Sequence, residues 1–140
     1  NEKNGPPPEV NLFNEKNNGE TLLSLIEKNY IKSAHDVSLG GIITAVSKMC
    51  IKGNKGLELK IPKFLINEIE YFFAEDQGRY IIEVSLEDLK DVIKILDKNS
   101  VHYDQIGKII DKQLIINQKT KVTIDELKSF NTNWLKDYMI

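Results

Sequence analysis

The chain has 140 residues, a length typical of one folded domain, and 41% of them are hydrophobic, which is too many for a disordered chain. The formal net charge is −2, whereas a dedicated nucleic-acid-binding protein would be basic. No apolar run reaches the ~18 residues of a membrane-spanning helix, and a single cysteine, Cys50, excludes an intrachain disulfide. We therefore expect a cytoplasmic protein that contacts neither nucleic acid nor a membrane.

The opening segment, "NEKNGPPPEV", is polar and rich in proline, and its first residue is not methionine. This composition predicts a linker over residues 1–18 that follows missing upstream domains, and a folded domain over residues 19–140. Asn18 and Gly19 are expected to precede a first helix over residues 21–30. Its apolar face would consist of Leu22, Leu25 and Ile26.

The next segments alternate between strand and helix patterns. Residues 31–37 are expected to form a short strand, and the helical spacing that starts at Ile42 predicts a helix ending at Gly53. "GLELKIP" alternates apolar and charged residues, which predicts a strand with one buried face. "FLINEIEYFF" is ambiguous. As a helix its apolar face would be Ile66, Ile69 and Phe73.

The second half predicts a buried strand over residues 79–84 and then two capped helices. Ser85 with Asp88, and Thr123 with Glu126, have the spacing of a capping box. The first box would open a helix with the face Leu86, Leu89, Val92, Ile93 and Leu96. The second would open a helix with the face Leu127, Phe130, Trp134 and Tyr138. "VHYDQIGKII", "QLIIN" and "KVTI" read as three short strands between them. The pattern predicts an α+β fold, with a mixed or antiparallel sheet covered by helices on one side.

The stretch "SAHDVSLGGIITAV" places polar and flexible residues where a strand is expected to meet a helix. A helix N-terminus leaves backbone N–H groups unpaired and favours phosphate, and Gly40 and Gly41 would let a ligand approach them. Asp36 would repel phosphate unless Mg²⁺ lies between them, so Asp36 is a candidate metal ligand. His35 is a candidate catalytic residue, as an acid, a base or a donor to an oxyanion.

Each of these residues also has a purely structural interpretation that the sequence leaves open. Ser38 can serve only as the helix cap, the two glycines can serve only for close packing, and His35 can be a buried histidine with satisfied hydrogen bonds. The pattern is shorter than a P-loop and lacks its closing Gly-Lys-Ser/Thr.

A second polar cluster, "FFAEDQGRY", stands just before the predicted strand at residues 79–84. It contains Glu75, Gln77 and Arg79, the only arginine of the chain. A guanidinium holds oxyanions in a two-pronged geometry, so these residues are expected to face the same ligand as Asp36. The other interpretation is a polar surface turn.

Outside both clusters, the cysteine of the predicted helix that ends at Gly53, Cys50, is expected to be buried in the core.

Four stretches, "AHDVSLGG", "FAEDQGRY", "IGKI" and "LKSFNTNWLKDYM", occur in an order that resembles one family over nearly all 140 residues. They resemble the carboxy-terminal domain of the synthetase subunit of phosphoribosylformylglycinamidine synthases, in the aminoimidazole-ribonucleotide-synthetase-like superfamily. One departure is Leu39, which stands where that family usually has an acidic residue after the serine.

The resemblance implies an ATP-dependent ligase of purine biosynthesis. Formylglycinamide ribonucleotide, ATP and glutamine-derived ammonia would give the amidine, ADP and phosphate through an iminophosphate, with Mg²⁺ as a further cofactor. Most ligands of ATP and Mg²⁺ would lie upstream of this chain, which alone would be inactive. Expected partners are the upstream domains, a glutaminase subunit and a small accessory subunit. His35, Asp36 and Ser38 would be the first contacts with the site, and Glu75 and Arg79 the next.

Three other interpretations remain. Another ATP-dependent enzyme of the same superfamily, such as a thiamin-monophosphate kinase, would carry a "D-x-S-D-G" loop and no "EDQGR". A stand-alone α+β ligand-binding or regulatory module would bind a ligand without turnover. A nucleic-acid module is disfavoured by the acidic balance.

Overall fold

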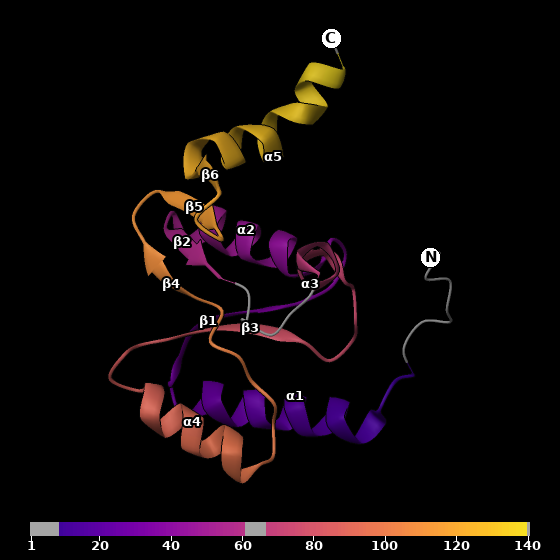
Figure 1. The fold of residues 1–140 in the computed structure, drawn as a ribbon, viewed down its shortest axis with the longest axis vertical. Helices are drawn as coiled ribbons and strands as arrows, with labels where there is room; N and C mark the ends of the chain where they lie inside the picture. Colours follow the sequence, from indigo (N-terminus) through magenta and orange to yellow (C-terminus); the bar gives the residue numbers. More distant parts are fainter. Residues whose placement is uncertain (1–8, 61–66, 140) are drawn as a thin grey trace. The chain divides into compact units, whose positions relative to one another are not determined.

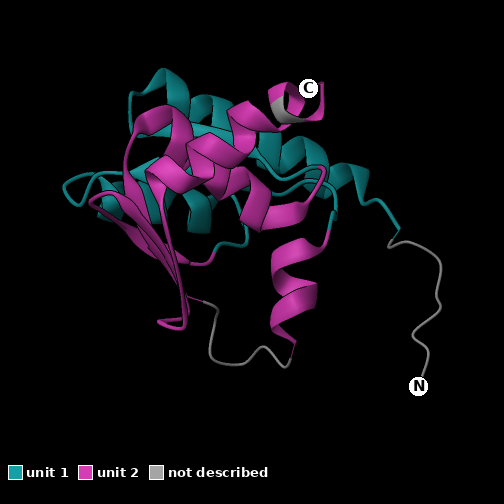
Figure 2. Cartoon of the chain, turned by 90° about the horizontal axis from the view of Figure 1, so that it is seen from above, with its two compact units in different colours: residues 1–38, 75–103 teal, residues 39–74, 104–140 magenta. Residues whose placement is uncertain are grey.

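The computed structural model of the chain describes residues 9–60 and 67–139 (Figure 1). Ile61 and Ile66, which the sequence placed on a strand and on a helix face, lie outside these described residues. The chain divides into two compact units, residues 1–38 with 75–103 and residues 39–74 with 104–140, which are coloured separately in Figure 2.

Within residues 9–38 and 75–103, the first unit has two helices and a two-stranded sheet. Its elements are α1 (Leu12–Glu27), β1 (Ile31–Asp36), β3 (Tyr80–Val84) and α4 (Leu89–Lys98). The two strands pair antiparallel, with Asp36 opposite Tyr80. Leu25 of α1 packs with Val92 and Leu96 of α4, and partly buried residues of both strands pack against this cluster. The strand predicted over residues 31–37 is therefore confirmed.

Helix α1 begins nine residues earlier than expected, because residue 12 rather than residue 21 is its first residue. The side chain of Asn11 caps it by accepting a hydrogen bond from the backbone N–H of Asn14, at 3.0 Å. Asn18 and Gly19, predicted as cap residues, lie inside the helix. The prediction was wrong because polar composition was taken as the mark of a linker, whereas α1 begins with an asparagine cap and uses its amide side chains for tertiary hydrogen bonds.

The turn before α4 keeps the contacts of the predicted capping box but is not yet helical. The Ser85 hydroxyl donates to Asp88 Oδ2 at 2.6 Å and accepts the Asp88 N–H at 3.2 Å. The helix begins only at Leu89. Leu86 consequently lies in the turn, is 86% exposed, and is not part of the buried face that the sequence assigned to it.

The described residues of the second unit form three helices and a four-stranded mixed sheet. Its elements are α2 (Gly41–Gly53), β2 (Gly56–Leu59), α3 (Glu68–Phe73), β4 (Gly107–Ile110), β5 (Gln113–Ile116), β6 (Thr120–Thr123) and α5 (Ile124–Tyr138). The strand order is β4-β2-β5-β6, with β2 antiparallel to β4 and parallel to β5. The α+β class is confirmed, and the strands form two sheets rather than the single one expected.

The core of this unit lies between α2 and the sheet. Its buried residues include Ile42, Ala45, Val46 and Cys50 of α2, with Leu59, Phe72, Leu114 and Ile124. The helix predicted from residue 42 to Gly53 and the burial of Cys50 are confirmed. Helix α3 resolves the ambiguous segment, but its buried residue is Phe72, whereas Ile69 and Phe73 are exposed. The predicted face of α3 was therefore wrong.

Helix α5 has the predicted capping box between Thr123 and Glu126. At the same end of the helix, Lys128 Nζ donates to the side chain of Asn54, the C-cap residue of α2, at 2.7 Å. Its predicted apolar face is present but uncovered in the described chain, since Phe130, Trp134 and Tyr138 are all exposed. Among the described residues, no helix combines the length and apolar character needed to cross a bilayer.

Candidate functional site

The end of β1 brings the two predicted polar clusters together. Asp36 is the last residue of the strand, and the backbone N–H of Val37 donates to the carbonyl of Arg79 at 2.8 Å. His35 pairs with Ile81 in the same register. The first part of "SAHDVSLGG" therefore lies directly beside the end of "EDQGR" along the backbone. That the two clusters face one ligand stays a prediction.

His35 is held at one of its two ring nitrogens. Its Nδ1 lies 2.6 Å from the backbone carbonyl of Asp36, and its side chain is 25% exposed. A carbonyl oxygen only accepts hydrogen bonds, so in this arrangement Nδ1 carries the proton and donates it. The neutral ring then presents the lone pair of Nε2, which is the atom suited to accept a proton or a hydrogen bond.

The turn into α2 differs from the prediction at Ser38. No side chain caps this helix, and its N-cap residue is Gly40, which has a left-handed backbone with φ of +81°. Ser38 is exposed and stands two residues before the cap, so the predicted role of its hydroxyl as helix cap was wrong. Leu39, between them, is 79% exposed.

Gly41 is required for close packing. Its φ is +68°, and a Cβ atom there would lie 2.5 Å from the backbone oxygen of Phe72 and 2.8 Å from backbone atoms of Phe73. Any side chain at this position would therefore collide with the end of α3. The packing interpretation of this glycine holds whether or not a ligand approaches the N-terminus of α2.

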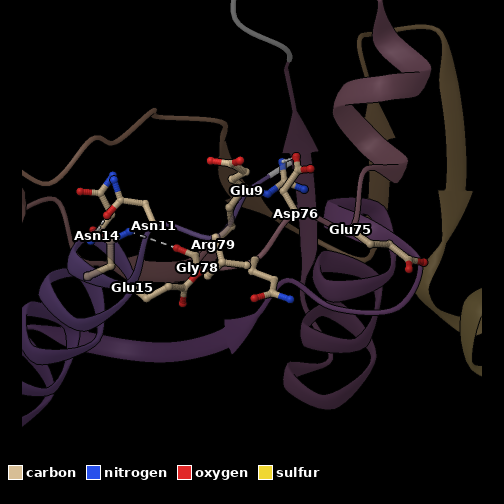
Figure 3. Close-up of a pocket in the computed structure, with 11 residues that line it drawn as sticks. Glu9, Asn11, Asn14, Glu15, Glu75, Asp76, Gly78 and Arg79 are labelled. Atoms are coloured by element: carbon tan, nitrogen blue, oxygen red, sulfur yellow. Dashed lines mark hydrogen bonds and ion pairs between the residues drawn. The ribbon is translucent and has the colours of Figure 1, made fainter. Parts of the chain in front are cut away.

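A pocket of about 490 Å³ lies beside the loop of residues 75–79 (Figure 3). Its opposite wall is formed by Glu9, Val10 and the first two turns of α1, which contribute Asn11, Asn14, Glu15 and Asn18. The Asn18 amide donates to the carbonyl of Gly78 at 3.1 Å and so ties the loop to α1. Gly78 has φ of +70°, and a Cβ there would meet the Glu15 carboxylate.

The charge of this pocket is mainly acidic. Glu9, Glu15, Glu75 and Asp76 face or border it, against the single guanidinium of Arg79. Arg79 Nη1 lies 3.9 Å from Asp76 Oδ2, and its side chain is 28% exposed. Figure 3 shows the Glu75 side chain directed away from Arg79. Such a surface repels a polyphosphate by itself, so phosphate binding here needs additional positive charge.

The described residues do not form a metal cage. No group of three or more histidine, cysteine, aspartate or glutamate side chains has an arrangement that could hold a metal ion in residues 9–60 and 67–139. The Asp36 side chain is 66% exposed, and its Oδ1 lies 3.4 Å from Nδ1 of His35. Magnesium prefers six oxygen ligands in an octahedron, so Asp36 alone does not fit a complete site for it.

The structure places the predicted residues in two groups. His35, Asp36, Ser38, Glu75, Gln77 and Arg79 belong to the first unit, and Gly40 and Gly41 to the second. The α1 residues that line the pocket were missed, because they fall in the segment predicted as a linker. Asn11 directly before the apolar pair Leu12 and Phe13 was the available signal, since asparagine is a preferred N-cap.

Residues 1–117 match the family model described as "AIR synthase related protein, C-terminal domain". The chain belongs to this family. A shared fold does not by itself decide which reaction a member supports.

Two curated relatives of this C-terminal domain narrow the comparison. The chain is 67% identical over 139 residues to "Phosphoribosylformylglycinamidine synthase subunit PurL" of Pelagibacter ubique (strain HTCC1062). The matched segment covers 99% of this chain and 19% of the relative. The chain is 33% identical over 135 residues to the protein of the same name from Rhodopseudomonas palustris (strain BisB5), covering 96% of this chain and 18% of the relative. The chain thus spans less than a fifth of the length of these relatives.

Solved structures show the same fold. "Structure of PurLQS from Thermotoga maritima" matches with a TM-score of 0.76 and 22% identity, over 86% of this chain and 22% of that one. "T. maritima PurL complexed with FGAR" matches with a TM-score of 0.73 and 23% identity, over 84% and 21%. A more distant match, "Crystal structure of HypE-HypF complex", has a TM-score of 0.55 and 18% identity, over 76% and 39%.

Proposed function

We propose that this chain is the C-terminal synthetase domain of a phosphoribosylformylglycinamidine synthase. The longer protein would convert formylglycinamide ribonucleotide, ATP and glutamine-derived ammonia to the amidine, ADP and phosphate in purine biosynthesis. The observation that carries the proposal is the 67% identity over 139 residues to a relative of that name. The two polar clusters, at the end of β1 and in the loop of residues 75–79, support the proposal. They contain the stretches "AHDVSLGG" and "FAEDQGRY", on which the resemblance to these synthases rests.

The chemistry is activation of an amide. ATP supplies a phosphoryl group to the amide oxygen, and ammonia then displaces phosphate from the iminophosphate. On this proposal His35 presents Nε2 to the reacting groups, where it accepts or returns a proton. On this proposal four further residues face the substrate or nucleotide. They follow one another from the last residue of β1 to the first residue of α2, and they are Asp36, Ser38, Gly40 and Gly41.

The second cluster contributes charge and shape. Arg79 is the only guanidinium of the chain, and Gln77 and Glu75 flank it in the loop held by Asn18. Because the surrounding pocket is mainly acidic, Arg79 is suited to orient one oxyanion rather than to neutralise a whole triphosphate. On this proposal the rest of the positive charge comes from Mg²⁺, and most of the Mg²⁺ ligands belong to the polypeptide outside this chain.

The partners follow from the same proposal. Ammonia must be produced from glutamine, which calls for a glutaminase subunit, and a small accessory subunit would complete the assembly. One matched structure is of a complex described as PurLQS, which is consistent with such an assembly. The upstream domains of the same polypeptide would be the nearest partners of this chain, in the cytoplasm.

The test compares the complete gene product with the isolated 140-residue chain. Phosphate release is measured with formylglycinamide ribonucleotide, ATP, Mg²⁺ and ammonium chloride, which removes the need for a glutaminase. The complete protein is expected to release phosphate only when the ribonucleotide is present, and the isolated chain to show no turnover. Turnover by the isolated chain, or a complete protein that ignores the ribonucleotide, would contradict the proposal.

The role of His35 is tested in the complete protein with a matched histidine. His35→Asn is expected to lower kcat by about 10²–10⁴-fold, the usual contribution of a general acid or base. His102→Asn is the control, because His102 is exposed and lies outside both polar clusters. Equal effects of the two substitutions would remove His35 from the catalytic assignment.

A gene product that starts at residue 1 would favour the stand-alone binding module instead.

A further inference from the structure

The last helix presents a row of large apolar side chains to solvent. Phe130, Trp134 and Tyr138 follow one another at intervals of four residues, which places them on one side of α5. Their exposed fractions are 77%, 62% and 84%. Leu135 and Met139, the residue after the helix, are also exposed. We call Phe130, Trp134 and Tyr138 the aromatic face of α5.

The half of α5 that carries this face makes little contact with the described chain. Every residue from Ser129 to Met139 whose side chain is described is exposed. The contacts of the helix lie in its first turns, where Ile124 is fully buried and Lys128 reaches Asn54. Helices of this length gain most of their stability from packing of an apolar face, so a helix with such a face uncovered indicates a missing neighbour.

The position of α5 along the chain connects this face with the longer relatives. The match to the general family model ends at residue 117, before α5 begins at Ile124. The similarity to the Pelagibacter relative, in contrast, covers 99% of the chain and therefore extends into α5. The helix is thus shared with the synthase relatives but lies outside the family's general domain model.

We propose that the aromatic face of α5 is an interface, and that its occupant is another region of the same polypeptide, from the part that precedes Asn1. The proposal rests on the proposed function, in which this chain is the last domain of a longer synthase. About four fifths of the Pelagibacter relative lies outside the matched segment, which covers 19% of it. A region joined covalently is present at a high effective concentration, which favours it over a separate molecule.

The side chains define the chemistry of the occupant. Phe130 needs an apolar surface, while Trp134 and Tyr138 each combine an apolar ring with a polar N–H or O–H group. The matching surface is therefore an apolar groove with hydrogen-bond acceptors at its border. A charged or strongly hydrated surface would not fit this face.

Photo-crosslinking in the complete protein tests the proposal. Trp134 is replaced by the photoreactive amino acid p-benzoylphenylalanine, another large aromatic residue, and crosslinked peptides are identified by mass spectrometry after irradiation. The matched control carries the same residue at Lys136, which is exposed on the opposite side of the helix. The ribonucleotide-dependent phosphate release of each variant is measured in parallel.

The expected result is an intramolecular crosslink from position 134 to a peptide upstream of Asn1. No such crosslink is expected from position 136. A crosslink to a second copy, to another subunit or to a peptide within residues 1–140 would overturn the proposal, as would equal crosslinking at both positions. The phosphate assay separates the two hypotheses. An active protein without the upstream crosslink refutes only the interface, whereas an unsubstituted complete protein without ribonucleotide-dependent activity refutes the proposed function.

Discussion

Helices α4 and α5 have the same kind of sequence and different surroundings. Both have an apolar row at helical spacing, and before each helix a hydroxyl side chain accepts the backbone N–H of the residue three positions later. This hydroxyl lies in a turn before α4 and in the last residue of β6 before α5. In α4 the row is covered, and Val92 and Leu96 pack against Leu25 in a buried cluster. In α5 the row is exposed along Phe130, Trp134 and Tyr138.

The difference shows what an amphipathic pattern specifies. Periodicity determines which residues share a helix face, but it does not determine which polypeptide covers that face. The cover of α4 lies within the chain, and no described residue buries the aromatic face of α5. The apolar row of α4 is therefore explained by packing within the chain. The apolar row of α5 is not covered by any described residue, and so it supports the proposal of a partner surface.

The largest expected effect separates the two faces directly. In the 140-residue chain, Leu96→Ala removes a buried side chain and is expected to lower the free energy of unfolding of its unit by about 2–5 kcal/mol. Trp134→Ala removes an exposed side chain and is expected to change it by less than about 0.5 kcal/mol. Chemical denaturation followed by circular dichroism measures both. Similar losses for the two variants would mean that α5 is covered within this chain.

Helix α2 extends the comparison to a face whose packing depends on one glycine. Gly41→Ala adds a Cβ 2.5 Å from the Phe72 carbonyl oxygen and places alanine at φ of +68°. The substitution is expected to cost about 2–3 kcal/mol, from left-handed strain and overpacking together. Gly53→Ala is the control, because a Cβ at Gly53 meets no atom within 4 Å. An equal tolerance of both alanines in thermal unfolding would refute the close contact of Gly41 with α3.

A smaller effect is expected at the start of α5. Thr123→Ala removes the hydroxyl that accepts the Glu126 N–H at 3.2 Å, and N-cap losses of this kind cost about 1 kcal/mol. Thr123→Ser keeps the hydroxyl and should restore most of the helix content measured by circular dichroism. If serine and alanine behave alike at this position, the cap does not hold α5 in the isolated chain.

The smallest effect is a pH dependence of α5. The pKa of Glu126 is lowered by hydrogen bonds, first from the backbone N–H of Thr123 and then from its hydroxyl. A lowered pKa in the folded state means that the carboxylate stabilises the fold above its ordinary pKa of 4.5, and that this stabilisation is lost as the pH falls through the lower folded value.

The measurement is the melting temperature of α5 between about pH 6 and pH 3, a range that spans the ordinary pKa of a glutamate. Wild-type protein should be more stable than Glu126→Gln at the upper end, and the difference should disappear toward the lower end. A constant difference across the range would show that ionisation of Glu126 does not contribute to the cap.

The sequence predicted the elements that have strong local signals. The strand at residues 31–36, the helix that ends at Gly53 and the Thr123–Glu126 box are confirmed, because period and cap residues are local properties. Helix α1 was predicted too short, because asparagines that make tertiary hydrogen bonds resemble linker residues when the sequence is considered alone. The exposed row of α5 could not be foreseen, since exposure depends on neighbours far along the chain or outside it.

The candidate site was predictable in its location and less so in its chemistry. The pairing of Val37 with Arg79 brings together two clusters that the sequence identified separately. The acidic wall from α1 was missed, and Ser38 does not cap α2, because the chain turns at Gly40 instead. The roles of His35, Asp36 and Arg79 stay predictions, since they depend on ligands and domains beyond this chain.

The claim that this chain is completed by a longer polypeptide is tested most directly by hydrogen–deuterium exchange of α5. The backbone amides of residues 129–139 are compared in the isolated 140-residue chain and in the complete protein, with the amides of α4 as the internal reference. We predict fast exchange of these α5 amides in the isolated chain, strong protection in the complete protein, and equal protection of α4 in both. Fast exchange of α5 in both proteins would contradict the claim.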